Sequence, residues 1–204
     1  MDEFITEDYI PKQYTGRQTE IVETRTMPDE DAAIKFFLAA KEKLLQVNQW
    51  HFLCGFLSPA FQLSNISGQP VNKFPDVGDF IRINIPGPGT KAGRGYDWVK
   101  IERLTHIHLD NHQELFFLQV RPAAYPQSDE DEVAHFFKNS ATSSFMIVRE
   151  LKQVTAAVYG RNEVANTTTN NEIDNIRNEV IANSGAIGLS TMQWKSLVAA
   201  LLKD

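Results

Sequence analysis

The sequence predicts an α+β fold in which a curved antiparallel sheet of six to seven strands packs on a long C-terminal helix. Segments that alternate apolar and polar residues follow one another over short links, as antiparallel strands do. Residues 190–203 carry an apolar stripe at helical spacing, which offers the sheet a partner. At 204 residues the chain is expected to form one domain from 18 to 204, preceded by an N-terminal arm at 1–17.

The strands are predicted from residue type and period. Residues 18–27 are rich in Thr, Val and Ile, which favour extended structure. In 79–85, Ile81, Ile83 and Ile85 alternate with polar residues, which indicates a strand with one buried face. The remaining predicted strands cover residues 61–66, 96–108, 114–122, 143–151 and 153–161.

Helices are predicted before and between these strands. Pro28 and the acidic residues after it suit a helix start, and one long helix of about four to five turns is expected to follow. Its apolar face consists of Ala33, Phe36, Phe37, Ala40, Leu44 and Val47. A short helix is predicted over 128–139, where Ser128 precedes an acidic first turn.

The C-terminal part of the chain is predicted to be helical. A helix over 172–182 is expected to be followed by a glycine-containing break at 184–189. Ser190 and Gln193 match a capping box that would begin the last helix. The stripe expected to face the sheet consists of Trp194, Leu197, Val198, Leu201 and Leu202.

This order of elements resembles the helix-grip fold of the START-like superfamily, which includes polyketide cyclases, lipid-transfer domains and pollen-allergen-type ligand carriers. The resemblance rests on a strand at 20–27, the helix begun by Pro28, Trp50 soon after it, and the amphipathic end at 190–203. The chain departs from the pattern in three ways: one long helix replaces a pair of short ones, an acidic insertion occupies 128–139, and an extra helix precedes the last. The resemblance implies a mostly apolar cavity between the sheet and the terminal helix.

Composition excludes several classes of partner. The net charge of −6 and the scattered arginines argue against a nucleic-acid-binding surface, which usually shows a clustered basic face. No apolar run approaches the ~18 residues of a membrane-spanning helix, so membrane insertion is not expected. Cys54 is the only cysteine, and the acidic N-terminus is unlike a secretory signal. The expected location is therefore cytoplasmic.

The loop at 86–95 contains four of the chain's eleven glycines. GPGTKA within it matches a dinucleotide-binding pattern, but that pattern needs a helix after the loop to receive the phosphates. Trp98 and Val99 follow instead and favour a strand, while Pro86 and Pro88 remove backbone donors. We expect a long, mobile hairpin loop that binds no nucleotide.

Histidines suggest a metal site only weakly. His106 and His108 would project from the same face of a strand, and Asp110 and His112 lie close by in the sequence. The alternative is a solvated hairpin, because residues 109–113 have the composition of a turn. We favour the hairpin and expect neither a metal nor another cofactor.

Other polar residues are expected to be structural. Cys54 and His51 lack the orienting group that a nucleophile and its base need. His135, close to the acidic run at 129–132, is expected at the surface. The polar strand end at 160–163 is expected to tie chain segments together through hydrogen bonds.

The candidate ligand-binding residues are Trp98, Arg121, Phe145, Arg149 and Tyr159. Arg149 shares a strand face with Phe145, and an unpaired buried guanidinium is costly. It must therefore meet a protein carboxylate, reach water in an open pocket, or await an acidic ligand. The acids considered as its partner are Glu102, Glu150 and Glu163.

The sequence thus favours a binding module for a small apolar or acidic ligand, which an inward Arg149 or Arg121 would pair. Two alternatives stay open. A cyclase- or hydrolase-like enzyme would bring titratable groups together in the same cavity. An interaction protein would have a filled core and would present the acidic segment 128–132 and the loop 86–95 to a partner.

Overall fold

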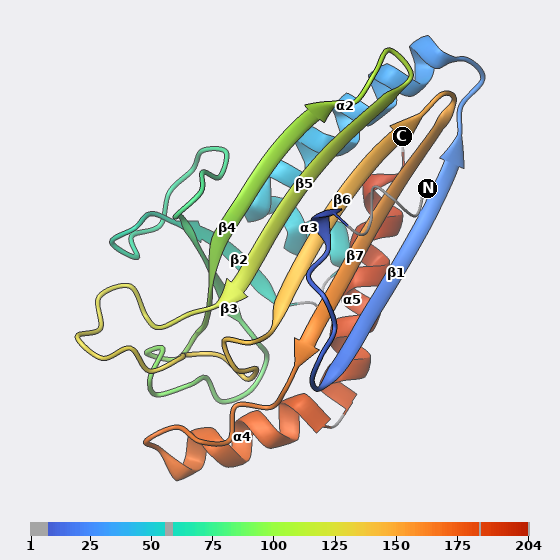
Figure 1. Cartoon of the computed structure of the whole chain (residues 1–204). Helices are drawn as coiled ribbons and strands as arrows, with labels where there is room; N and C mark the ends of the chain where they lie inside the picture. The colour runs from blue at the N-terminus through green and yellow to red at the C-terminus, as the bar shows by residue number, and fades with distance from the viewer. Residues whose placement is uncertain (1–7, 56–58, 184, 204) are drawn as a thin grey trace.

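The chain folds around one seven-stranded antiparallel sheet (Figure 1). The computed structural model describes residues 8–55, 59–183 and 185–203, and for 183 and 185–192 the backbone alone. The strand order is β1-β7-β6-β5-β4-β3-β2, and all neighbouring strands are antiparallel. The strands are β1 (Arg17–Thr26), β2 (Ala60–Ser64), β3 (Phe80–Asn84), β4 (Asp97–His108), β5 (Gln113–Pro122), β6 (Thr142–Glu150) and β7 (Gln153–Glu163). The predicted sheet is confirmed.

Helices cover one face of this sheet. They are α2 (Glu30–Leu45), the 3-10 turn η1 (Val47–Gln49), α3 (Trp50–Cys54), α4 (Glu172–Asn183) and α5 (Gly185–Leu201). The curved sheet wraps around α5, with α2 and α3 beside it, while α4 lies beyond one end of the strands (Figure 1). This is a helix-grip arrangement, as predicted. In the described part of the chain, no helix is long and apolar enough to span a membrane.

The helix after Pro28 is α2, whose 16 residues form the four to five turns that were predicted. Asp29 caps it by accepting a hydrogen bond from the backbone N–H of Ala32, and the helix ends at Leu45. After η1 a second short helix, α3, begins at Trp50. The expectation of one long helix in place of a pair is therefore wrong.

The terminal helix is longer than predicted. Its backbone is already helical from Gly185, so Ser190 and Gln193 do not mark a helix start, and the break expected at 184–189 is absent from the described residues. The predicted stripe does face the sheet. The core contains Leu197, Val198, Leu201 and Leu202 of this helix, and the partly buried Trp194 packs against it.

A bulge in β4 decides which of its side chains face the helices. The pairing of β4 with β5 shifts between Ile101 and Arg103, which leaves Glu102 as an extra residue. Before the bulge Ile101 lies in the helix-facing core. After it His106 faces the same way, with its ring centroid 5.8 Å from that of Phe37 in α2.

The N-terminal arm covers the outer face of the sheet (Figure 1). Ile10 joins an apolar cluster on that face. The side-chain oxygen of Asn162 accepts hydrogen bonds from the backbone N–H groups of Tyr14 and Thr15. The polar strand end at 160–163 thus ties chain segments together, and the segment it holds is the arm. Residues 1–7 of the arm lie outside the described residues.

The segment 128–139 contains no helix, contrary to the prediction. It is an extended connection that forms isolated bridges with neighbouring backbone, one of them through Phe137. Its consecutive residues His135, Phe136 and Phe137 are all buried, which one face of a surface helix cannot achieve. Asp97 accepts a hydrogen bond from the Phe136 N–H and so fixes this path.

Candidate functional site

The described residues enclose a cavity of about 160 Å³ between the concave face of the sheet and helices α3 and α5. Its aromatic lining consists of Trp50, Phe61, Phe136, Phe137, Phe145 and Trp194. Isoleucines and valines of β3, β4 and β5 add to the apolar wall. The polar residues that reach it are His135, Ser143, Glu163 and Gln193. A mostly apolar wall with a few polar groups is typical of small-molecule sites.

Trp50 organises the aromatic wall. Its indole N–H donates a hydrogen bond to the carbonyl of Leu44, at 3.0 Å, which fixes the ring at the junction of α2 and α3. Its ring centroid lies 5.1 Å from that of Phe145 and 5.4 Å from that of Phe61. Trp194 of α5 meets Phe145 edge-on at 5.2 Å. Such tilted and edge-on contacts are favourable, so these rings stabilise one another in the wall.

His135 contributes a buried imidazole to the wall of the cavity. Its Nδ1 accepts a hydrogen bond from the Phe137 N–H at 2.9 Å, so the neutral ring carries its proton on Nε2. No described residue forms a hydrogen bond with Nε2. Burial, with a further contribution from the Arg177 charge, lowers the pKa of His135 to about 3. The imidazole is therefore neutral at pH 7, and the expectation that it lies at the surface is wrong.

The low pKa of His135 predicts that the protein loses stability in acid. Below the ordinary pKa of 6.5 the unfolded chain protonates this imidazole, whereas the folded chain does so only near pH 3. The free energy of unfolding should therefore fall as pH decreases through this window, by at most about 1.4 kcal/mol per pH unit from this group.

Urea unfolding of wild type and His135→Phe at a series of pH values measures this contribution. The free energy of unfolding of the variant should change less with pH than that of wild type, by the contribution of one titrating group. Equal slopes in wild type and His135→Phe would contradict the buried neutral imidazole.

Gln193 and Glu163 complete the polar part of the cavity. The side-chain nitrogen of Gln193 is buried and has no hydrogen-bond partner among the described residues. Glu163 accepts a hydrogen bond from the Thr19 hydroxyl at 3.0 Å. Burial raises the pKa of Glu163, against the opposing effects of that hydrogen bond and of nearby arginines. The cavity wall thus holds one buried donor without a described acceptor and a carboxyl whose pKa is raised.

Only Phe145 of the five candidate residues lines this cavity. Tyr159 packs in the apolar cluster of the outer face. Trp98 donates its indole N–H to the Gly93 carbonyl at 3.1 Å and packs against Tyr125. Arg121 pairs with Glu102 at 2.6 Å, away from the cavity.

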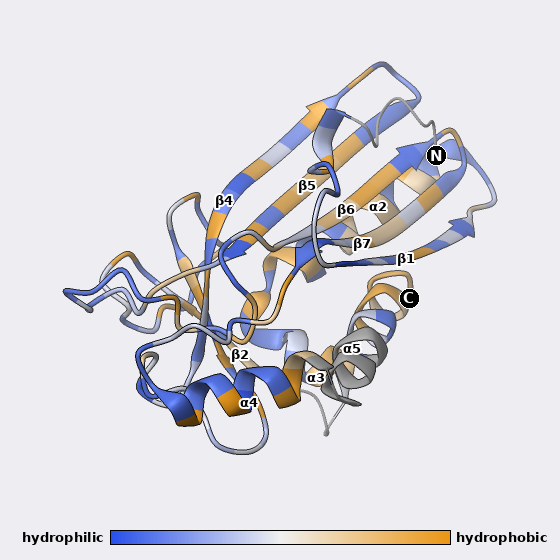
Figure 2. Cartoon of the chain, turned by 60° about the horizontal axis from the view of Figure 1, so that its bottom comes forward, coloured by the Kyte–Doolittle hydropathy of each residue, from blue (hydrophilic) through white to orange (hydrophobic). Residues whose placement is uncertain are grey.

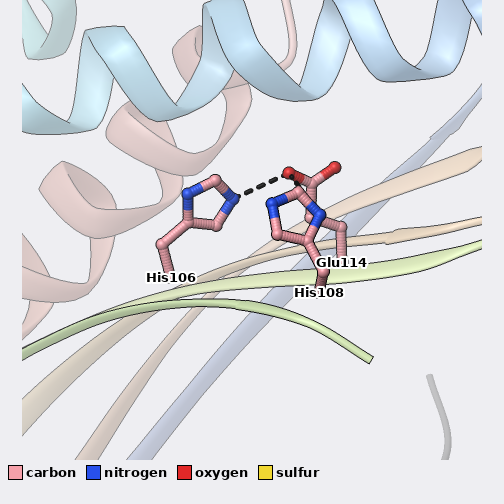
Figure 3. A group of neighbouring side chains, drawn as sticks. All are labelled: His106, His108 and Glu114. Carbon is pink, nitrogen blue, oxygen red and sulfur yellow. Dashed lines mark hydrogen bonds and ion pairs between the residues drawn. The ribbon is translucent and has the colours of Figure 1, made fainter. Parts of the chain in front are cut away.

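Arg149 faces the helices, as expected, but at the other end of the groove. Its Nε lies 3.4 Å from a carboxylate oxygen of Glu114, a residue not among the acids considered from the sequence. The same carboxylate accepts a hydrogen bond from Nε2 of His106 at 2.7 Å, with His108 beside it (Figure 3). Arg149 therefore belongs to an ion pair within the protein, and it is not an anchor for a ligand in the cavity.

The loop at 86–95 lies between β3 and β4, and its backbone binds a carboxylate of the protein. The carboxylate of Asp174 accepts hydrogen bonds from the backbone N–H groups of Lys91, at 2.9 Å, and Ala92, at 3.3 Å. Arg177 donates to the carbonyl of Pro88 at 2.6 Å. Backbone donors that would meet a phosphate are thus occupied, and the expected mobile loop is tied to α4.

α4 is oriented with its polar side inward. Asp174, Arg177 and Asn178 are buried, whereas Ile173 and Ile176 are exposed. Figure 2 shows how much of this helix is hydrophilic. The apolar side chains of Ile173 and Ile176 therefore do not mark the buried face of this helix, whose inward contacts include ion pairs and hydrogen bonds.

Cys54 has no catalytic setting. Burial raises the pKa of its thiol to about 12, so the nucleophilic thiolate is not formed near pH 7.

The candidate residues chosen from the sequence include none of the four polar residues of the cavity, which are His135, Ser143, Glu163 and Gln193. For His135 a signal existed, since the run His135-Phe136-Phe137 is too apolar for an exposed acidic segment. Gln193 was interpreted as a helix cap and Glu163 as part of a structural strand end.

A scan against protein-family models found no match, and no curated protein matches the sequence. Solved structures do match. Ara h 8.0201 has 12% identity and a TM-score of 0.36, covering 92% of this chain and 100% of that one. Truncated norcoclaurine synthase from Thalictrum flavum has 11% identity and a TM-score of 0.39, covering 95% and 99%. A protein from Arthrobacter aurescens has 11% identity and a TM-score of 0.40, covering 90% and 85%. The fold assignment rests on the strand order and packing described above.

Proposed function

We propose that this chain binds a small, uncharged and largely apolar ligand in the cavity between the sheet and α5. The observation that carries the proposal is an apolar cavity in which the buried side-chain nitrogen of Gln193 has no hydrogen-bond partner among the described residues. An unsatisfied buried donor is costly, so a ligand with a carbonyl or hydroxyl oxygen would gain by accepting from it. The order of strands and helices also supports distant membership of the START-like superfamily.

The volume of the cavity limits the ligand. An apolar cavity of roughly 150 Å³ is large enough to bind benzene. The cavity here, at about 160 Å³, suits one aromatic ring or a short branched chain with a single polar group.

The charges around the cavity disfavour an acidic ligand. No arginine or lysine is among the described residues that line the cavity. Arg121 and Arg149, the two cations considered for this role, are paired with Glu102 and Glu114. Glu163 in the wall would repel an anion whenever it is ionised. A neutral ligand is therefore favoured.

Filling the cavity should abolish binding. Val120→Phe adds a ring to the wall, and we expect it to weaken the affinity for compounds such as phenol and benzaldehyde at least tenfold. Val22→Phe makes the same change at a position of β1 that is 47% exposed, and it should leave affinity unchanged. Isothermal titration calorimetry measures both, with thermal unfolding to verify that each variant folds. Unchanged affinity in folded Val120→Phe would exclude this cavity as the binding site.

A second candidate function is supported by Glu163. A carboxyl whose pKa is raised by burial, inside a cavity, can act as a general acid or base, which favours a cyclase- or hydrolase-like enzyme. Hydrolysis of p-nitrophenyl acetate by wild type provides the test. If Glu163→Gln abolishes turnover but retains affinity for phenol, the cavity is an active site; if wild type shows no turnover above background, the binding module remains the better proposal.

A further inference from the structure

Three side chains of metal-ligating type converge between α2 and the sheet (Figure 3). They are His106 and His108 of β4 and Glu114 of β5, and their ligand atoms lie within 4.8 Å of one another. The bulge in β4 turns both imidazoles toward the helix side, and the register places Glu114 opposite His108. None of the three lines the cavity, so this is a separate site.

We propose that His106, His108 and Glu114 bind a Zn²⁺ ion. Two imidazole nitrogens and one carboxylate oxygen form a donor set that zinc accepts, with a fourth position left for water. Access is open on one side, since the His108 side chain is 70% exposed.

The two separations that involve Glu114 lie within about 1 Å of those in a tetrahedral zinc site, and all three ligand atoms lie within 4.8 Å of one another, so the histidines must also move closer together. Bonds of about 2.0–2.1 Å in a tetrahedron place ligand atoms about 3.3–3.5 Å apart. Glu114 Oε1 lies 3.6 Å from His108 Nδ1, which already fits. It lies 2.7 Å from His106 Nε2, where the two now share a hydrogen bond, so this separation must widen by less than about 1 Å.

The carboxylate is already positioned by Arg149. The Arg149 and Glu114 side chains are 3% and 4% exposed, and the guanidinium engages Oε2 at 3.4 Å, which leaves Oε1 toward the histidines. Arg149 also donates to the backbone carbonyls of His112, at 3.0 Å, and Asn111, at 3.4 Å. It therefore holds both the ligand and the β4–β5 turn, as groups outside the coordination sphere do in metal sites.

Lys41 of α2 opposes the metal. Its ammonium lies 3.3 Å from His106 Nδ1 and can only donate, so the proton of His106 lies on Nε2, the atom that would bind zinc. Coordination through Nε2 moves that proton to Nδ1, where it faces the ammonium. Lys41 must then turn away, so removing its charge should strengthen the site.

The test is calorimetric titration of Zn²⁺ into the full chain, with Co²⁺ as a spectroscopic probe of four-coordinate geometry. His108→Ala removes an exposed ligand, so folding should be retained, and the affinity for Zn²⁺ should fall at least tenfold. His112→Ala is the matched control: it lies on the same hairpin but pairs with Glu30 at 2.7 Å, and affinity should not change. Lys41→Met should bind Zn²⁺ several-fold more tightly than wild type.

Each result supports or overturns the site. Equal Zn²⁺ affinity in wild type and His108→Ala, or the absence of visible d–d bands with Co²⁺ in wild type, would exclude it. Weaker binding in His112→Ala, by as much as in His108→Ala, would place the ion elsewhere on the hairpin. A Lys41→Met variant that binds no more tightly than wild type would contradict coordination through Nε2 of His106.

Discussion

Replacing Arg177 with methionine is expected to lower the free energy of unfolding by about 3–5 kcal/mol, because it leaves a buried carboxylate without its cation. The Arg177 guanidinium donates to both oxygens of Asp97, at 2.5 and 3.2 Å. The two side chains are 4% and 1% exposed. The same guanidinium donates to the Pro88 carbonyl. One residue of α4 therefore holds both the start of β4 and the 86–95 loop.

Urea unfolding measures this loss, and a surface pair provides the control. Arg121 pairs with Glu102 at 2.6 Å, but the two side chains are 33% and 32% exposed. Arg121→Met should therefore cost less than about 1 kcal/mol. The double variant Asp97→Leu/Arg177→Met should be more stable than Arg177→Met, since it removes the uncompensated charge. Equal losses from Arg177→Met and Arg121→Met would show that the buried pair stabilises no more than a surface pair.

The sheet could be predicted from the sequence because strand identity depends on local residue type and period. Ile81 and Ile83 mark β3 without knowledge of any partner. The stripe of α5 is local in the same way. The local sequence does not decide which face of a strand points toward the helices, because the arm buries apolar residues on the outer face of the sheet as well. Tyr159 and Phe145 are both buried aromatics, yet they lie on opposite faces.

The polar residues of the cavity and of its surroundings could be predicted only in part, because partners distant in the sequence determine where they lie. The path of the chain at His135 depends on Asp97 of β4, which accepts a hydrogen bond from the N–H of the next residue, Phe136. The partner of Arg149 depends on the register of β5 against β6, which sets Glu114 opposite it. Glu102 occupies a bulge that shifts the phase of β4, and the period-two pattern gave no sign of it.

Replacing Arg149 with methionine should lower the free energy of unfolding by about 3 kcal/mol and leave ligand affinity unchanged. The variant removes the cation from Glu114, a side chain that is 4% exposed, and a buried pair broken on one side is strongly destabilising. It also leaves the carbonyls of His112 and Asn111 without a donor. His106 still donates to Glu114, so the loss should lie at the lower end of the usual range.

Two measurements on this variant separate the roles that Arg149 could have. Urea unfolding reports its part in the ion pair, and calorimetry with phenol reports any part in the cavity. Arg149→Met/Glu114→Gln should recover part of the lost stability, because no uncompensated charge then remains. If Arg149→Met instead kept wild-type stability and lost affinity for phenol, the guanidinium would be a ligand anchor and the geometry of its pair with Glu114 would be wrong. Because the Glu114 carboxylate and two backbone carbonyls already accept its donors, a ligand would have to displace existing hydrogen bonds to reach it.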